Sequence, residues 1–275
     1  MKNNYITGFL IACLTIFFGG TFQVKAQLPD DFQLVEMYSG FTNATTITFA
    51  PDGRIFVLDR FGEIFIHKPE LFSTVSAGVL PVYHGAEDGL LAMAFDPNFD
   101  SNNWIYVYYS LVDEEKNRVS RFTMNGDLLD LSSEINMLEW EVQRIKSYHA
   151  GGDMGFDSQG NLLISTGDNS NHGDYAQIGE NFNPNSAEKS SSNTNDLRGK
   201  ILRIKPQSNG TYSVPAGNLF PQGTPNTRPE IYVMGARNPY RFFIDKQNND
   251  WIFWGEVGPD ANQSSPTEVQ LVWTK

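Results

Sequence analysis

The sequence has almost no cysteine: Cys13 is the only one among 275 residues. It lies in an apolar run over residues 6–18 that follows a short polar start and precedes Val24-Lys25-Ala26. This order is typical of a secretory signal peptide, and the run is short for a membrane span. We predict a signal over residues 1–26, cleaved after Ala26. An uncleaved anchor and a lipid anchor at Cys13 are the alternatives.

The predicted mature chain, residues 27–275, therefore has no cysteine at all. Disulfides, thiolate nucleophiles and cysteine–zinc sites are excluded for it. Histidine is also scarce, and the spacing of His67, His84 and His172 suits no zinc site, so we interpret these three as structural.

Basic residues are few as well, with 20 Lys and Arg against 32 Asp and Glu. Removing residues 1–26 takes away two lysines and no acid, which leaves 18 basic residues and a net charge of −14. Strongly acidic chains are poor ligands for nucleic acids and anionic membranes. We expect neither kind of partner after signal cleavage, and we expect a secreted, periplasmic or cell-surface location.

No segment carries a helical stripe longer than a turn or two. Apolar residues instead alternate with a period of two, which is typical of half-buried strands. Asp52-Gly53, Asn125-Gly126, Gln159-Gly160 and Asn209-Gly210 separate these runs and are hairpin signals. The predicted strands are 45–49, 54–58, 63–66, 90–95, 104–110, 118–124, 141–147, 161–166, 200–204, 230–234, 241–245, 251–254 and 268–273.

A strand–turn–strand unit recurs along the chain. Phe49, Phe95, Phe156 and Ile244 mark the same point of four copies, with spacings of 46, 61 and 88 residues. Repeated hairpins with loops of growing length favour a β-propeller over a solenoid. At roughly 40–50 residues per blade, the mature chain has material for about four blades. Because the sequence stops on a strand pattern, we interpret it as the N-terminal part of a longer propeller.

One hairpin carries a candidate catalytic pair. His149 precedes Gly151-Gly152 at a strand entry, and Asp168 closes the same hairpin 19 positions later. The two ends of a hairpin meet at one sheet edge, where such a pair would be a base with an orienting carboxylate. A structural histidine and a turn aspartate are the plainer alternatives, and the residues alone leave both open.

Two further segments are candidates for the same face. Arg237-Asn238 follows another strand and offers a planar cation to an anionic cofactor or an oxyanion. The polar loop from Asp168 to Asp196 is either a solvated insertion or a loop that contributes substrate or calcium contacts.

Several motifs, in chain order, resemble the glucose/sorbosone dehydrogenase family of soluble, six-bladed propellers that use pyrroloquinoline quinone (PQQ). The resemblance runs from about Phe32 to the last residue. It rests on the segments 87–99, 149–168, 195–204, 235–239 and 254–260.

The resemblance implies specific roles. His149 would take the proton from the sugar's anomeric hydroxyl, and Asp168 would orient His149. Arg237 would stabilise negative charge on the quinone, and Asn238 would help to seat it. The carbonyl groups of Gly258 and Pro259 would bind a calcium ion that also contacts the quinone.

Two positions depart from the pattern of the glucose enzymes. Glu87-Asp88 stands where they have glutamine before Asn-Gly-Leu-Leu, so these two residues would set substrate recognition. Val257 replaces a glutamine in the calcium loop. The sequence thus predicts a quinone- and calcium-dependent oxidation of the C1 hydroxyl of an aldose or related sugar alcohol, with an external electron acceptor. A non-catalytic propeller that binds carbohydrate or protein is the alternative.

Overall fold

The computed structural model describes residues 33, 36, 38–145, 148–170 and 187–258. The predicted signal peptide, Pro259 and the last predicted strand lie outside the described residues. The chain divides into two units, Met1–Gly40 and Phe41–Lys275, and the fold below is that of the second unit. No helix in the described part is long and apolar enough to cross a membrane.

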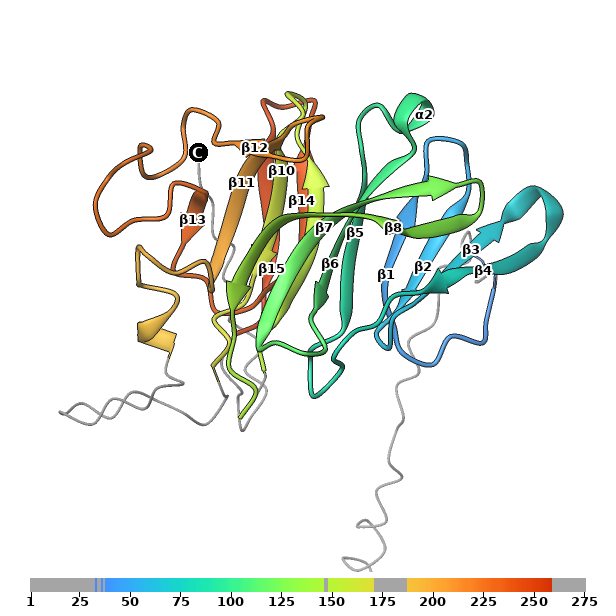
Figure 1. The fold of residues 1–275 in the computed structure, drawn as a ribbon, viewed down its shortest axis with the longest axis horizontal. Helices are drawn as coiled ribbons and strands as arrows, with labels where there is room; N and C mark the ends of the chain where they lie inside the picture. Colours follow the sequence, from blue (N-terminus) through green and yellow to red (C-terminus); the bar gives the residue numbers. More distant parts are fainter. Residues whose placement is uncertain (1–32, 34–35, 37, 146–147, 171–186, 259–275) are drawn as a thin grey trace, which may run out of the picture. The chain divides into compact units, whose positions relative to one another are not determined.

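Antiparallel strands dominate the described chain, and they form four sheets (Figure 1). Helical structure is confined to η1 (Pro69–Leu71), α2 (Phe99–Asn102) and η2 (Ala187–Lys189). The first sheet contains β1 (Ala44–Phe49), β2 (Ile55–Asp59), β3 (Glu63–Lys68) and β4 (Ser73–Val79). The second contains β5 (Leu90–Phe95), β6 (Trp104–Ser110), β7 (Lys116–Asn125) and β8 (Leu128–Glu141). The third contains β9 (Gly151–Phe156), β10 (Leu162–Thr166) and β11 (Lys200–Pro206), with both β12 (Tyr212–Ser213) and β13 (Ile231–Met234) paired to β11. The fourth is the hairpin of β14 (Pro239–Asp245) and β15 (Trp251–Glu256).

The predicted repeat is present in the strand register. Its four marker residues all lie in the first strand of a sheet, and each pairs with an Ile or Leu of the second strand. The pairs are Phe49 with Ile55, Phe95 with Ile105, Phe156 with Leu162, and Ile244 with Ile252. A pair of apolar residues therefore stands at the same place between the first and second strands of each sheet. This is why the pattern is visible in the sequence.

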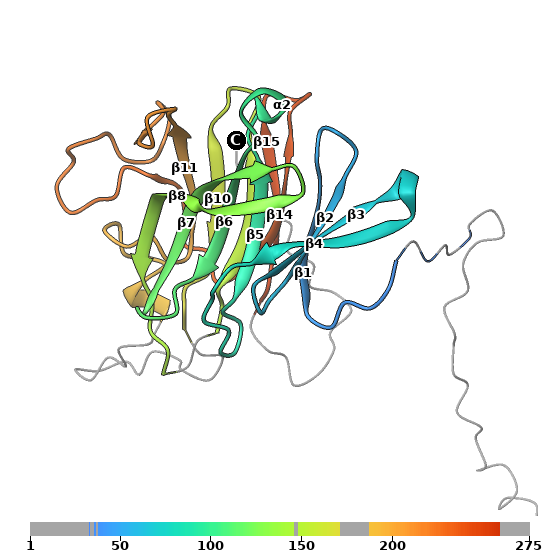
Figure 2. The same ribbon diagram turned by 45° about the vertical axis from the view of Figure 1, so that its right-hand side comes forward.

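The sheets lie side by side in chain order (Figures 1 and 2). Strand β5 contacts both β1 and β9, and β9 also contacts β14, so the first strands of all four sheets are neighbours. Apolar side chains fill the space between adjacent sheets. Phe56, Leu58, Ile105 and Phe122 belong to the cluster between the first two sheets, and each is at most 1% exposed.

Two strand predictions need correction. The predicted strand 141–147 is wrong, because β8 ends at Glu141 and residues 142–145 are not extended in a sheet. Strand β9 was expected only through the repeat, and the two-residue β12 was not expected. Strands β4 and β8 were not expected either. Their exposed positions interrupt the apolar alternation, and the cross-strand bonds that stabilise them come from β3 and β7.

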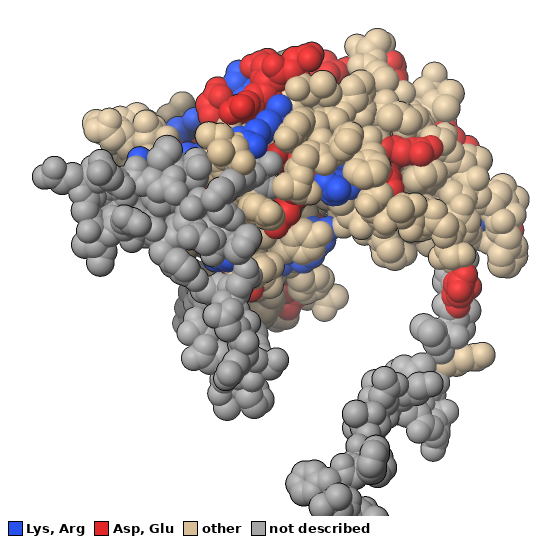
Figure 3. Space-filling model, turned by 90° about the horizontal axis from the view of Figure 1, so that it is seen from below, with Lys and Arg blue, Asp and Glu red and all other residues tan. Residues whose placement is uncertain are grey.

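Charged side chains are unevenly distributed on the face shown in Figure 3. Lys and Arg occupy small, separate areas of it, and Asp and Glu cover a broader one.

Candidate active site

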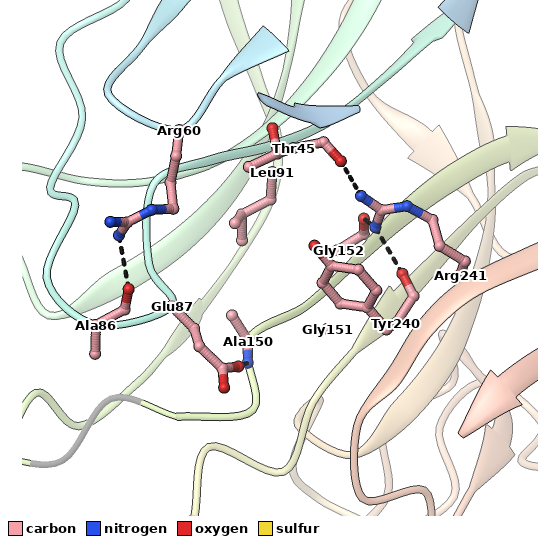
Figure 4. Close-up of a pocket in the computed structure, with 10 residues that line it drawn as sticks. All are labelled: Thr45, Arg60, Ala86, Glu87, Leu91, Ala150, Gly151, Gly152, Tyr240 and Arg241. Carbon is pink, nitrogen blue, oxygen red and sulfur yellow. Dashed lines mark hydrogen bonds between the residues drawn. The ribbon is translucent and has the colours of Figure 1, made fainter. Parts of the chain in front are cut away.

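A cavity of about 230 Å³ lies where the first strands of the four sheets approach one another (Figure 4). Each of these strands contributes to its wall. Arg241 of β14 donates hydrogen bonds to the carbonyl oxygens of Thr45 in β1 and Gly152 in β9, and so connects three sheets around the cavity. The lining residues are Thr45, Arg60, Ala86, Glu87, Leu91, Ala150, Gly151, Gly152, Tyr240 and Arg241.

His149 and Asp168 form a buried pair beside this cavity. The distance between His149 Nδ1 and Asp168 Oδ1 is 2.8 Å, and the two residues are 4% and 2% exposed. An ionised carboxylate only accepts hydrogen bonds, so a neutral His149 paired with one donates from Nδ1 and keeps the lone pair on Nε2. Nε2 has no hydrogen-bond partner among the described residues. The pair is thus arranged as a base with an orienting carboxylate.

The backbone around this pair is held in an unusual conformation. His149 has a φ of 55°, in the left-handed region that non-glycine residues rarely adopt. A Cβ atom on Gly167 would lie 1.8 Å from the His149 carbonyl oxygen, so only glycine fits there. Tyr108 donates from Oη to the Ala150 carbonyl oxygen over 2.8 Å. Burial raises the pKa of Tyr108 far above its usual range, which keeps this donor protonated.

The Arg237–Asn238 turn is connected to the same site by hydrogen bonds that main-chain N–H groups donate. The Asp168 N–H donates to the Arg237 carbonyl oxygen over 2.8 Å, and the Gly151 N–H donates to Asn238 Oδ1 over 2.9 Å. Glu256 Oε1 accepts the N–H groups of both Arg237 and Asn238, at 2.8 and 2.5 Å. The structure therefore brings His149, Asp168, Arg237 and Asn238 together as one connected unit.

The two acidic residues of the predicted recognition segment lie in different environments. Glu87 lines the cavity, and its Oε2 accepts the Ala150 N–H over 3.2 Å, directly beside His149. Asp88 is 1% exposed, and its Oδ1 accepts a hydrogen bond from Ser110 Oγ. Asp88 is not among the residues that line the cavity. Of the two, Glu87 is positioned to contact a ligand there.

The side chains around the cavity suit a planar, anionic cofactor. Arg60 and Arg241 line the cavity, and their guanidinium groups donate to main-chain carbonyl oxygens, those of Ala86 and Gly152 among them. The main chain of Arg237 bonds to Asp168, and its guanidinium group donates to the Val257 carbonyl oxygen. Arginine recognises carboxylates and quinone-type oxygens by charge-assisted hydrogen bonds. PQQ carries several carboxylates, so the positive charge of these three arginines suits it electrostatically, while the guanidinium hydrogen bonds just named are made to main-chain carbonyl groups.

A calcium site is less well defined by the described residues. Gly258 is exposed at the end of the described chain, and its predicted co-ligand Pro259 lies beyond it. The neighbouring carbonyl of Val257 accepts a hydrogen bond from Arg237 Nη1 over 2.7 Å. Within the described residues, no group of three or more acidic, histidine or cysteine side chains is arranged to hold a metal ion.

Glu256 and Arg241 are site residues that sequence patterns did not identify. Both stand close to motifs that carried the resemblance, Glu256 inside the segment 254–260 and Arg241 three positions after Asn238. Their partners are distant in the chain, since Arg241 lies 196 positions from Thr45. The only signal in the sequence was a charged residue within a strand, since Arg241 lies in β14 and Glu256 ends β15.

Replacing Glu256 with alanine is expected to weaken cofactor uptake more than tenfold. The change removes the acceptor of two main-chain N–H groups, and the turn that carries Arg237 and Asn238 loses its support. Equilibrium titration of the full-length protein with PQQ measures the effect, and Glu63→Ala in the first sheet is the control. Unchanged affinity in Glu256→Ala would contradict this role.

The four-sheet architecture, the central cavity and the connected polar unit define a β-propeller of the sugar dehydrogenase type. Residues 41–264 match the family model of Glucose / Sorbosone dehydrogenase, and the chain belongs to this family. The predicted all-β propeller is confirmed. A putative oxidoreductase (glucose dehydrogenase) from Thermus thermophilus superposes with a TM-score of 0.67 and 27% identity, covering 82% of this chain and 61% of that one. The PQQ-bound aldose sugar dehydrogenase from Streptomyces coelicolor superposes with a TM-score of 0.63 and 23% identity, over 82% and 59%.

Curated relatives include proteins of two kinds. Human Hedgehog-interacting protein is 27% identical over 245 residues, which are 80% of this chain and 32% of that protein. An aldose sugar dehydrogenase of Escherichia coli is 24% identical over 218 residues, which are 78% of this chain and 53% of that protein. The chain thus spans between a third and about half the length of these relatives.

Proposed function

We propose that this chain belongs to a secreted, PQQ- and calcium-dependent oxidoreductase that oxidises the C1 hydroxyl of an aldose or related sugar alcohol. The buried His149–Asp168 pair, with its 2.8 Å hydrogen bond, is the observation that carries the proposal. A buried, oriented base beside a cavity suits proton removal from a bound hydroxyl.

In the proposed reaction, His149 Nε2 takes the proton of the C1 hydroxyl while the C1–H bond breaks and the C1–O double bond forms. Asp168 holds the imidazole in the tautomer that leaves Nε2 unprotonated, and it stabilises the imidazolium that results. Bound PQQ would supply the acceptor for the hydride that leaves C1 and the route for two electrons to an external acceptor.

Arg237 and Asn238 would bind the cofactor in this scheme. The Arg237 guanidinium would place positive charge where negative charge grows during hydride transfer. The Asn238 side chain would fix the Gly151 end of β9 against the cofactor pocket, through the hydrogen bond it accepts from the Gly151 N–H. The proposed calcium ligands are the carbonyl groups of Gly258 and Pro259.

Glu87 is the proposed contact for the substrate. A carboxylate accepts hydrogen bonds from sugar hydroxyls but donates none, whereas the glutamine at this position in the glucose enzymes does both. Selectivity among aldoses should therefore differ from that of the glucose enzymes.

The experiment is reconstitution of the full-length protein with PQQ and calcium, followed by an assay with an artificial electron acceptor. A panel of aldoses, sugar alcohols and a no-sugar blank is measured with and without the cofactor. Sugar-dependent acceptor reduction that requires PQQ supports the proposal. Tight PQQ binding without any sugar oxidation would leave the fold assignment intact and reject the activity.

A non-catalytic binding propeller is the second candidate. One relative is named for an interaction with Hedgehog, and Glu87 and Val257 differ from the residues of the glucose enzymes. In that case the cavity or its rim would bind a carbohydrate or a protein surface. Binding of a sugar by calorimetry, with no PQQ uptake at any calcium concentration, is the result that favours this candidate.

A further inference from the structure

Lys200 is a buried cation that the proposed chemistry does not use. It is the first residue of β11, pairs with Thr166 at the end of β10, and is 0% exposed. Its ammonium group donates to three carbonyl oxygens, those of Ser190, Ser191 and Arg198, at 2.8, 2.9 and 2.7 Å. No described carboxylate lies within ion-pair distance of it. Burying a charge without an oppositely charged partner costs free energy of desolvation, which other interactions of the group must offset.

The first link from Lys200 to the site runs through Ser190. The Ser190 carbonyl accepts from Lys200, and Ser190 Oγ donates to the Asp168 carbonyl oxygen over 2.7 Å. The Gly199 N–H, one residue before Lys200, donates to the Gly167 carbonyl oxygen over 2.8 Å. Lys200 therefore fixes the segment against which the main chain of Asp168 rests.

The second link reaches the Arg237 turn. The Gly235 N–H donates to the Ser191 carbonyl oxygen, and the Ala236 N–H donates to the Gly199 carbonyl oxygen, each over 3.1 Å. The carbonyl groups around Lys200 thus belong to a segment that touches both halves of the site. Loss of the ammonium group would leave three carbonyl groups without their donor.

The charges of Lys200 and Asp168 also interact. Asp168 Oδ1 accepts bonds from His149 Nδ1 and the Ser170 N–H, whereas Oδ2 is buried and has no hydrogen-bond partner in the described part of the chain. Burial lowers the pKa of Lys200 to about 8, Asp196 and Asp168 raise it, and Arg198 lowers it.

We infer that Lys200 is a positioning residue for the His149–Asp168 pair, which it serves by holding in place the 190–199 segment that bonds to the Asp168 main chain and by placing a buried positive charge near that residue. The expected effect of Lys200 on turnover rests on the proposed function. The charge interaction itself is testable without turnover.

The first test measures the titration of Lys200 by NMR in the cofactor-free, full-length protein labelled with ¹³C at lysine Cε. Asp168→Asn removes one of the two anions that raise the pKa of Lys200, the other being Asp196, so the Lys200 midpoint should fall. Asp130→Asn, an exposed residue of β8, is the control and should leave the midpoint unchanged. An unchanged midpoint in Asp168→Asn overturns the inference.

The second test compares turnover of the reconstituted protein. Lys200→Met keeps most of the side-chain length without the charge, and we expect kcat to fall at least tenfold. Lys200→Arg should recover part of the loss because it keeps the charge. Lys205→Met, on the same strand but exposed, is the matched control. Wild-type kcat in a folded Lys200→Met variant overturns the inference; if that variant does not fold, the Lys200 titration decides.

The two tests separate the inference from the proposed function. Coupling of Lys200 to Asp168 in a protein that oxidises no sugar supports the charge pairing and rejects the proposed activity. PQQ-dependent sugar oxidation without any coupling rejects the inference alone.

Discussion

His149→Gln is expected to lower the turnover of the reconstituted, full-length protein by about 10²–10⁴-fold, the usual contribution of a general base. The glutamine amide nitrogen can still donate a hydrogen bond to Asp168, so the fold around the site should persist. It cannot take a proton from the C1 hydroxyl. Because the base acts only as that proton departs, the loss should fall on kcat and leave the affinity for PQQ nearly unchanged.

Two further variants serve as a comparison and a control for His149→Gln. Asp168→Asn should cause a smaller loss, since the amide can present its N–H to Nδ1 and so favour the wrong tautomer. His67→Gln is the control, because His67 lies in β3 of the first sheet and bonds to Thr74. Steady-state rates beside PQQ titrations check all three. Wild-type turnover in His149→Gln would contradict the assignment of the base.

Gly167→Ala is the second change expected to have a large effect. Its Cβ atom would meet the His149 carbonyl oxygen at 1.8 Å and the His149 carbonyl carbon at 2.4 Å. Both atoms are main chain, so the two strand ends must move apart. A misplacement of about 1 Å at a reacting group can cost about 100-fold in rate. We expect a loss of that size, together with about 1–3 kcal/mol of stability from the overpacking.

The matched control is Gly255→Ala in β15. A Cβ atom there would have its nearest neighbour, the Arg241 carbonyl oxygen, at 3.9 Å, which is an ordinary contact. Urea unfolding of the full-length protein measures the stability, and the PQQ-dependent assay measures the rate. Equal behaviour of the two variants in both measurements would show that the close approach at Gly167 is unimportant.

The fold was largely predictable because the residues that pair in its repeat lie close together in the sequence. Phe95 and Ile105, for example, are ten positions apart and pair across β5 and β6, so a period of two and a turn signal suffice to find them. Strand β4 was missed because serine, threonine and glycine occupy much of it, and its stability comes from pairing with β3. Pairing of that kind has no local signature.

The site was only partly predictable for the same reason. His149 and Asp168 flank one hairpin, so their proximity follows from the chain between them. The bond from Glu256 to the Asn238 N–H also closes a hairpin, yet nothing in the sequence shows that a glutamate side chain turns back on it. The contact of Arg241 with Thr45 spans 196 positions and depends on how four sheets meet. The different environments of Glu87 and Asp88 depend likewise on the three-dimensional packing around them.

The most direct measurement is anaerobic stopped-flow mixing of the PQQ-loaded, full-length protein with an aldose and with the same aldose deuterated at C1. We expect the sugar to reduce the bound quinone in a single turnover. Deuterium at C1 should slow this reduction, and His149→Gln should slow it further. Quinone that stays oxidised with every aldose tested would contradict the proposed oxidation of an aldose by this protein.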